Sequence, residues 1–216
     1  MKHWLVGFLL IVGLLGCSKT DPSSSPYLRH TGPTPILVYG DSLSAGYGMT
    51  KEQAWPTLME QQLKSEGYLR QDQTIANYSK SDETTSGGLQ RFEQALEETQ
   101  PLVVVLELGA NDALRRQSMS EMRQNLDRMI GMAKTRNIDV ILVGVDLPSK
   151  FFFVNTKHFT TSYEELAQKH NLRLVPNLLK GVNNTSSLMM DDGLHPNSLG
   201  QPKIVENMWD VLTEAQ

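Results

Sequence analysis

The apolar run LVVVLEL at residues 102–108 constrains the fold of this chain more than any other feature of its sequence. A nearly continuous β-branched run, without alternating polar side chains, predicts a strand that is covered on both faces. Shorter apolar runs predict further strands at 35–39, 74–79, 139–145 and 172–176. Strands covered on both faces occur almost only in parallel sheets flanked by helices, so the pattern favours an α/β fold.

Segments with helical spacing of apolar residues separate these runs at 52–67, 88–99, 120–137 and 163–170, and another follows the last run at 198–215. Strands that alternate with helices in this way predict a single five-stranded parallel sheet with helices on both faces. In such sheets the ligand crevice lies at the carboxyl ends of the strands, so the loops that follow the strands should carry the function.

Composition limits the class of protein. The chain has 216 residues, which fits one domain with a full hydrophobic core, and no repeat or second domain is visible. The formal net charge is −4, so we expect no broad basic surface for nucleic acid. Cys17 is the only cysteine, which excludes a disulfide within the chain. We expect a monomer.

The first 17 residues have the pattern of a secretory signal peptide: a lysine at position 2, an apolar run, and small residues before Cys17. The apolar run is shorter than the roughly 20 residues that span a bilayer. LLGC followed by Ser18 resembles a bacterial lipobox, which implies that Cys17 becomes the lipid-modified first residue of the mature protein. A plain signal peptide or an uncleaved anchor is the alternative. Several acyl chains on one residue would hold the protein stably to a membrane.

The resemblance to lipoproteins also implies a location. A serine after the cysteine, rather than an aspartate, suggests the outer membrane, on the periplasmic side of the cell envelope. The segment 18–34 is rich in Ser, Pro and Thr, so it is expected to be a flexible tether. The folded domain is then expected to span 35–216.

The loops after the predicted strands carry unusual polar sequences. GDSLSAG (40–46) follows the first strand, SKSDETTSGG (79–88) the second and GANDAL (109–114) the third, and DDGLHPN (191–197) precedes the last helix. Because the carboxyl ends of parallel strands meet at one edge of a sheet, these loops are expected to converge.

Acyl transfer by serine needs a hydroxyl on a sharp turn, a histidine, a carboxylate that orients the histidine, and donors for the oxyanion. Ser42 can supply the hydroxyl and a free backbone N–H, because it lies where a helix begins. The Asp-x-x-His spacing lets Asp192 orient His195 from one turn, and Asn111 can supply a side-chain N–H.

Each of these residues also has a structural interpretation. Ser42 could cap a helix, although Ser44 is the better cap if Ser42 reacts, and Asp41 is expected to hold the loop through backbone hydrogen bonds. Asn111 could form a turn. Asp191 could replace Asp192 as the partner of the histidine, and both aspartates with His195 could bind a metal, but no second ligand cluster such as HExxH accompanies them.

GDSLS, GAND and DGLH, in this order, resemble blocks I, III and V of the GDSL, or SGNH, hydrolases, and most closely the bacterial thioesterase, lysophospholipase and arylesterase branch. The resemblance extends from about Pro35 to the C-terminus. It implies a three-layer α/β/α sandwich of the flavodoxin-like type, hydrolysis of acyl esters or thioesters, and neither metal nor organic cofactor. It also implies a triad of Ser42, Asp192 and His195.

The family's oxyanion donors would be the Ser42 backbone N–H, a backbone N–H of block II, and the Asn111 side chain. The sequence departs from the family in block II, where Asp82 stands in place of a glycine. A backbone N–H survives this replacement, but Asp is strained if φ is positive there, and its carboxylate would oppose an oxyanion unless it points to solvent. Gly87 and Gly88 could take this role only in a rebuilt loop.

The segment LPSKFFFV (147–154) follows the fourth strand on the crevice side, and Leu147 and Phe151 are candidates for a substrate pocket together with Met190. The phenylalanines could instead pack in the core or face a membrane, and methionine fills core gaps readily. Glu107 lies inside an apolar strand, where a carboxylate is costly unless paired, so we expect a structural pairing near the strand end.

The sequence therefore predicts a lipid-anchored serine hydrolase of small acyl esters or thioesters, with lysophospholipid as a further possible substrate. A polysaccharide O-acetyl esterase would keep the same fold, although the absence of extra domains or long insertions argues against it. A binding protein for a flavin or a nucleotide phosphate is the remote alternative. Asp41 would repel a phosphate, and no G-x-G-x-x-G follows the first strand.

Overall fold

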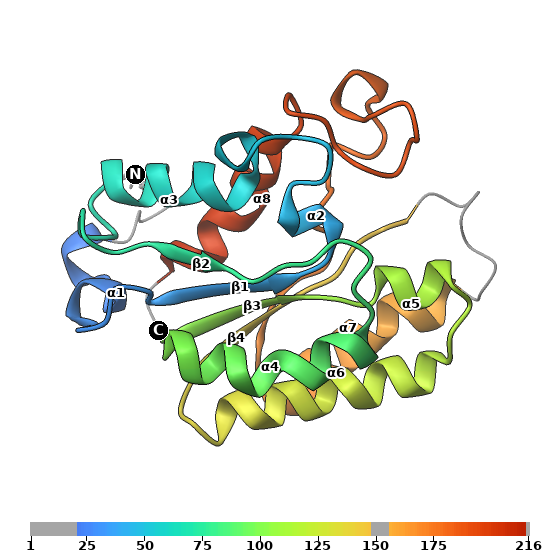
Figure 1. Cartoon of the computed structure of the whole chain (residues 1–216), viewed down its shortest axis with the longest axis horizontal. Coiled ribbons are helices and arrows are strands. Elements are labelled where there is room, and N and C mark those ends of the chain that lie inside the picture. The colour runs from blue at the N-terminus through green and yellow to red at the C-terminus, as the bar shows by residue number, and fades with distance from the viewer. Residues whose placement is uncertain (1–20, 148–155, 215–216) are drawn as a thin grey trace, which may run out of the picture.

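The computed structural model describes residues 21–147 and 156–214 and contains the expected parallel sheet (Figure 1). Its strand order is β2-β1-β3-β4-β5, and all four pairings are parallel. The strands are β1 (Ile36–Gly40), β2 (Ile75–Asn77), β3 (Val103–Glu107), β4 (Asp139–Val143) and β5 (Arg173–Val175). Each of the five predicted runs forms a strand: β1 is shifted by one residue and includes Gly40, and the other four are shorter than predicted at one or both ends.

The central strands are buried on both faces, as their apolar sequences require. Every residue of β1 and β3 is buried, and Leu37 lies between Ala76 of β2 and Val104 of β3 in the register. The helices are α1 (Pro26–Arg29), α2 (Ser42–Ala45), α3 (Trp55–Ser65), α4 (Thr85–Thr99), α5 (Ala110–Leu114), α6 (Met119–Lys134), α7 (Thr156–His170) and α8 (Gln201–Thr213).

The helices form the two outer layers of an α/β/α sandwich. In Figure 1, α3 and α8 cover one face of the sheet, while α4, α6 and α7 cover the other. Each long helix turns an apolar stripe inward: α3 buries Trp55, Met59 and Leu63, and Pro56 lies in its first turn, where proline costs no hydrogen bond. The three-layer architecture is therefore confirmed.

The chain reverses direction in the sheet between β1 and β3. From β1 it crosses through α3 to β2 at one edge, and it then returns through α4 to β3 on the other side of β1. A crevice opens at the carboxyl ends of two strands where such a reversal occurs. The loops that follow β1 and β3 therefore face each other at this end of the sheet.

The prediction of a flexible tether over 18–34 is wrong for the described part of that segment. Tyr27 in α1 is buried, and its hydroxyl donates a 2.9 Å hydrogen bond to the carbonyl of Leu212 in α8. The Gln73 side chain donates to the carbonyl of Tyr27, and the Ser25 hydroxyl donates to the carbonyl of Tyr68. One aromatic ring and these hydrogen bonds fix a segment whose composition is otherwise typical of a linker.

The signal segment and Cys17 lie outside the described residues. Within the part of the chain that the structure describes, no helix combines the length and apolar character needed to cross a membrane. The segment α1 packs at the amino ends of the strands, opposite α2 and α5 (Figure 1).

Candidate active site

Ser42 is the first residue of α2, directly after the loop that leaves β1. Asp41 caps this helix, because its Oδ1 accepts a 3.0 Å hydrogen bond from the Leu43 N–H. Gly46 ends the helix in the left-handed conformation, with φ 78°. The prediction that Ser44 caps the helix is wrong, because its hydroxyl donates to Glu107 instead, while the expected structural role of Asp41 is confirmed.

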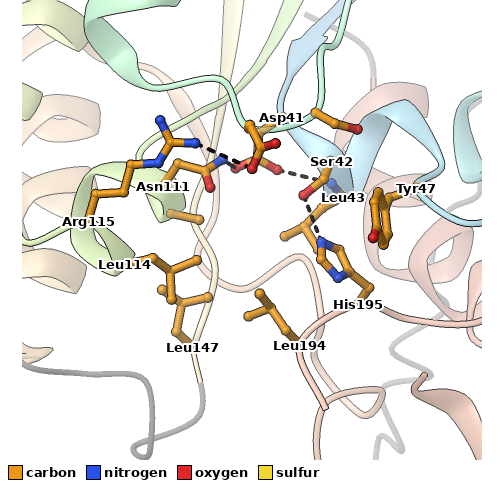
Figure 2. A pocket seen from close by; sticks show the side chains of 13 residues that line it. Asp41, Ser42, Leu43, Tyr47, Asn111, Leu114, Arg115, Leu147, Leu194 and His195 are labelled. Atoms are coloured by element: carbon orange, nitrogen blue, oxygen red, sulfur yellow. Dashed lines mark hydrogen bonds and ion pairs between the residues drawn. The ribbon is translucent and has the colours of Figure 1, made fainter. Parts of the chain in front are cut away.

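The structure brings Ser42, His195 and Asp192 together in one hydrogen-bonded line. The Nε2 atom of His195 lies 2.9 Å from the Ser42 Oγ (Figure 2). The Nδ1 atom of His195 lies 2.7 Å from the Asp192 Oδ2. A carboxylate can only accept, so Nδ1 donates to Asp192 and Nε2 is left to accept the proton of the Ser42 hydroxyl. This is the arrangement that a serine nucleophile and its base require.

Backbone N–H groups hold the Asp192 carboxylate in place. Its Oδ1 accepts from the N–H of Leu194 at 2.8 Å and from that of His195 at 2.9 Å. Partial burial alone would raise the pKa of Asp192, but the hydrogen bonds from the backbone and ring of His195 and from Leu194 outweigh it and lower the pKa. Asp192, and not Asp191, is therefore the partner of the histidine in this structure.

The ring of Tyr47 packs against the imidazole of His195, with ring centroids 4.4 Å apart and an interplanar angle of 31° (Figure 2). The Tyr47 N–H donates to the carbonyl of Ser42, so the Tyr47 backbone is hydrogen-bonded directly to the residue that carries the reactive hydroxyl. Sequence reasoning missed Tyr47, although it lies only five positions after Ser42 in the motif. The contact limits the rotation of the imidazole.

The three residues predicted to supply oxyanion donors line the same cavity. Asp82 and Asn111 lie beside Ser42 in its wall, and the backbone N–H groups of Ser42 and Asp82 donate no hydrogen bond among the residues described. The Asn111 side chain is buried, and its Nδ2 donates to the carbonyl of Glu83 at 2.9 Å and to Asp41 Oδ2 at 3.3 Å. The structure thus places all three predicted oxyanion donors around one space.

Asp82 has φ 65°, the left-handed conformation in which a glycine would be unstrained. Its side chain is 86% exposed and forms an ion pair with Arg115, with 3.3 Å between Oδ1 and Nη2. The Asp82 carboxylate therefore points to solvent. This is the condition under which the Asp82 backbone N–H could donate to an oxyanion without opposition from its own side chain. Arg115 was not recognised in the sequence.

Buried acidic groups support the first loop from behind. Glu107, at the end of β3, accepts from the Ser44 hydroxyl at 2.8 Å and from the Asp41 N–H at 3.4 Å, which confirms the expected structural pairing. Burial, together with the charge of Asp41, raises the pKa of Glu107 well above its ordinary value. A side chain at Gly40 would collide with Glu107, so a glycine is needed there.

Asp41 is buried as well. Burial, reinforced by the charges of Asp112 and Asp82, raises the pKa of Asp41 to about 7. The hydrogen bond from the Leu43 N–H acts in the opposite direction. Asp112 in turn accepts from the N–H and hydroxyl of Thr85 at 2.9 and 2.6 Å, which ties the loop after β3 to the start of α4.

The cavity beside Ser42 has a volume of about 310 Å³. Apolar side chains make up much of its wall: Leu43, Ala110, Leu114, Leu147 and Leu194 (Figure 2). Leu147 lies where the sequence predicted a pocket residue. Met190 does not line this cavity, because its sulfur and terminal methyl lie against Gly48, and Phe151 lies outside the described residues.

The alternative of a metal site gains no support from the geometry. No cluster of three or more His, Cys, Asp or Glu side chains that could hold a metal ion exists within 21–147 and 156–214. The ring nitrogens of His195 are both engaged, one with Asp192 and one with Ser42.

Comparison with known proteins agrees with this geometry. The sequence model of the GDSL-like lipase/acylhydrolase family matches residues 38–202. An arylesterase from Vibrio mimicus is 39% identical over 171 residues, which cover 79% of this chain and 84% of the relative. The thioesterase 1/protease 1/lysophospholipase L1 of Escherichia coli (strain K12) is 34% identical over 180 residues, covering 83% and 84%.

The fold is shared with a solved relative. The crystal structure of TesA superposes with a TM-score of 0.77 at 37% identity, covering 82% of this chain and 97% of that one. The sheet and its helices, and not only the short motifs, are therefore common to this group of proteins.

Proposed function

This chain belongs to the GDSL-like lipase/acylhydrolase family and hydrolyses carboxylic acyl esters or thioesters, and we propose that it does so through an acyl-enzyme on Ser42. The observation that carries the proposal is the 2.9 Å separation between the Ser42 Oγ and the His195 Nε2. In the first step Oγ attacks the acyl carbonyl carbon while Nε2 takes its proton. Asp192 stabilises the imidazolium that forms.

The oxyanion of the tetrahedral intermediate is stabilised by the backbone N–H groups of Ser42 and Asp82 and by the Asn111 side chain. The two backbone groups are supported in this role because their residues line the cavity and no described residue accepts a hydrogen bond from them. Asn111 would exchange the longer of its two hydrogen bonds, the 3.3 Å bond to Asp41, for the oxyanion.

The intermediate collapses when His195 gives the proton to the departing alcohol or thiol. Water then enters, His195 removes its proton, and attack on the acyl-enzyme releases the carboxylic acid and restores Ser42. No other acid or base is needed, because the same histidine serves both halves of the reaction.

Leucine side chains favour an apolar acyl group in the cavity. Leu114, Leu147 and Leu194 would bury methylene groups of the acyl chain, each of which contributes about 0.8 kcal/mol. The proposed substrates are therefore aryl esters and acyl thioesters with chains longer than acetyl. A series of p-nitrophenyl esters tests this proposal, since an enzyme specific for acetyl groups would fail beyond the shortest acids.

We further propose that Cys17 carries a lipid anchor and that the protein lies on the periplasmic side of the cell envelope, at the outer membrane. LLGC and Ser18 support this location. Asp21 is the fourth residue after Cys17, so the chain reaches at most roughly 14 Å between them. Since α1 packs at the amino ends of the strands, the cavity would open away from the anchor, which favours substrates that arrive from the aqueous side. Cys17→Ala should move the protein from the membrane fraction to the soluble fraction.

The direct test of the mechanism is Ser42→Ala, assayed on aryl esters, acyl thioesters and lysophospholipids. Turnover and covalent labelling by a fluorophosphonate should both disappear while the thermal unfolding curve stays that of the parent. Ser65→Ala, an exposed serine at the end of α3, is the matched control and should behave as the parent. Wild-type turnover by Ser42→Ala would refute the proposal.

A further inference from the structure

Asp82 combines two properties that conflict at an oxyanion site. In the proposed mechanism its backbone N–H donates to the oxyanion, yet the same residue carries a negative side chain. A glycine at this position would carry no such charge, so the conflict arises from the Asp82 side chain alone. A negative charge close to a developing oxyanion raises the barrier, because the two repel in a site that substrate shields from water.

Arg115 lies where it can resolve this conflict. It follows the last turn of α5, and its N–H donates to the carbonyl of Asn111, so it is fixed to the same helix as the side-chain oxyanion donor. Its guanidinium forms the ion pair with Asp82, the interaction drawn from Arg115 in Figure 2. Both residues line the cavity that contains Ser42.

We propose that Arg115 is a positioning residue for the reaction: it holds the Asp82 carboxylate at the outer rim of the cavity and offsets its charge. The Asp82 N–H can then donate to the oxyanion without opposition from its own side chain. This inference rests on the proposed function, because it assumes that the Asp82 N–H serves the oxyanion. It assigns a catalytic purpose to an exposed ion pair, which would contribute little to stability by itself.

A guanidinium at the rim could instead bind an anionic group of the substrate or act on other acids. The charge of Arg115 also attracts the buried Asp112, so a single substitution does not isolate the pair. Comparing the effect of replacing Arg115 in proteins with and without the Asp82 carboxylate does isolate the Asp82–Arg115 pair. An effect that Arg115 exerts through Asp82 vanishes when that carboxylate is absent.

The experiment is a double-mutant cycle with a p-nitrophenyl ester of an unbranched acid, which has no charge for Arg115 to bind. Arg115→Ala should lower kcat about tenfold, the size expected for a partly solvated charge at close range, with KM nearly unchanged. In the Asp82→Asn and Asp82→Gly backgrounds the same substitution should leave kcat within about twofold. Asn and Gly both accept a positive φ, so these backgrounds keep the backbone N–H in place.

Arg115→Lys retains the positive charge and should stay within about threefold of the parent. Arg136→Ala removes an arginine from a remote exposed ion pair with Glu93, and it should leave kcat unchanged. Unfolding curves verify that each variant is folded. An Arg115→Ala loss of equal size in all three backgrounds, no loss in the parent, or a Lys variant as impaired as Ala would each overturn the inference. The Ser42→Ala protein is run in the same series, and only its retained activity would overturn the proposed function as well.

Discussion

The hydroxyl of Ser44 donates a 2.8 Å hydrogen bond to the Oε2 of Glu107, and this bond joins the first loop to the end of the central strand β3. The same oxygen accepts a hydrogen bond from the Asp41 N–H. One carboxyl group therefore contacts Asp41 and Ser44, the residues that flank Ser42 and Leu43. The position of the nucleophile is therefore set from beneath by a buried group that does not touch the cavity.

Replacing Glu107 should separate these structural and chemical roles. Glu107→Ala leaves a buried hydroxyl and a buried N–H without an acceptor, so the free energy of unfolding should fall by about 2–4 kcal/mol. Glu107→Gln keeps an acceptor and should lose about 1 kcal/mol or less. Urea unfolding measures both, and kcat should fall for Ala because Ser42 is no longer held. Glu93→Ala, exposed on α4, is the control, and a Glu107→Ala protein with parental stability would contradict this account.

Asp192→Asn should reduce kcat by about a hundredfold or more with little change in KM, because the charge that stabilises the imidazolium is lost. The neighbouring exposed carboxylate offers a matched control: Asp191→Asn should retain activity close to that of the parent. Because the pKa of Asp192 lies below its ordinary value of 3.8, Asp192 stays ionised throughout the range from pH 5 to 8. Its titration should therefore cause no loss of activity in that range. Steady-state kinetics over that pH range measure both variants. Equal losses of kcat in Asp192→Asn and Asp191→Asn would contradict the prediction.

The sequence predicted the sheet and the reactive residues because both depend on local patterns. Uninterrupted apolar runs specify buried strands, and Ser42, Asn111, Asp192 and His195 lie in short motifs at the ends of predicted elements. The parallel sheet then brings those ends together, so no knowledge of side-chain packing was needed.

Features that depend on contacts between distant segments were missed. The burial of Tyr27 depends on its contact with α8, which lies far away in the sequence, and polar composition alone indicated a tether. Arg115 and Tyr47 follow recognised motifs closely, but their roles depend on Asp82 and His195, which lie far away in the sequence.

The boundaries of elements were shifted by side-chain hydrogen bonds. The helix α4 begins at Thr85 and not at 88, because the hydroxyl of Thr84 caps it and outweighs the paired glycines. The last helix begins at Gln201 and not at 198, because Asn197 Oδ1 accepts the N–H groups of Leu199 and Gly200 and holds them in a turn.

The docked segment before β1 should contribute to stability but not to turnover. Tyr27→Ala removes a buried ring and should reduce the free energy of unfolding by about 3 kcal/mol. Tyr27→Phe removes only the hydroxyl, with its hydrogen bond to Leu212, and should reduce the free energy of unfolding by about 1 kcal/mol. Chemical unfolding monitored by circular dichroism gives both values. The kcat of the folded enzyme should stay the same, since α1 lies at the opposite end of the sheet, and a large loss of kcat would contradict this separation.

Asp41 should make the stability of the protein depend on pH. Burial raises the pKa of Asp41 from 3.8 to about 7, so the folded state binds this proton more tightly than the unfolded state does. The resulting stabilisation is complete below about pH 4 and is lost as the pH rises through about 7. One such group changes the free energy of unfolding by up to about 1.4 kcal/mol per pH unit within that window. Glu107 and Asp112, whose pKa values are also raised, act in the same direction.

Asp41→Asn, which cannot ionise, should therefore show a weaker decline in stability than the parent between pH 4 and 7. Part of the decline should remain, because Glu107 and Asp112 still titrate. The measurement is the midpoint of urea unfolding at a series of pH values, with Asp210→Asn, exposed on α8, as a control that should follow the parent curve. Parallel curves for the parent and Asp41→Asn would mean that Asp41 carries the same protons folded and unfolded, and that its charge is accommodated within the loop that positions Ser42.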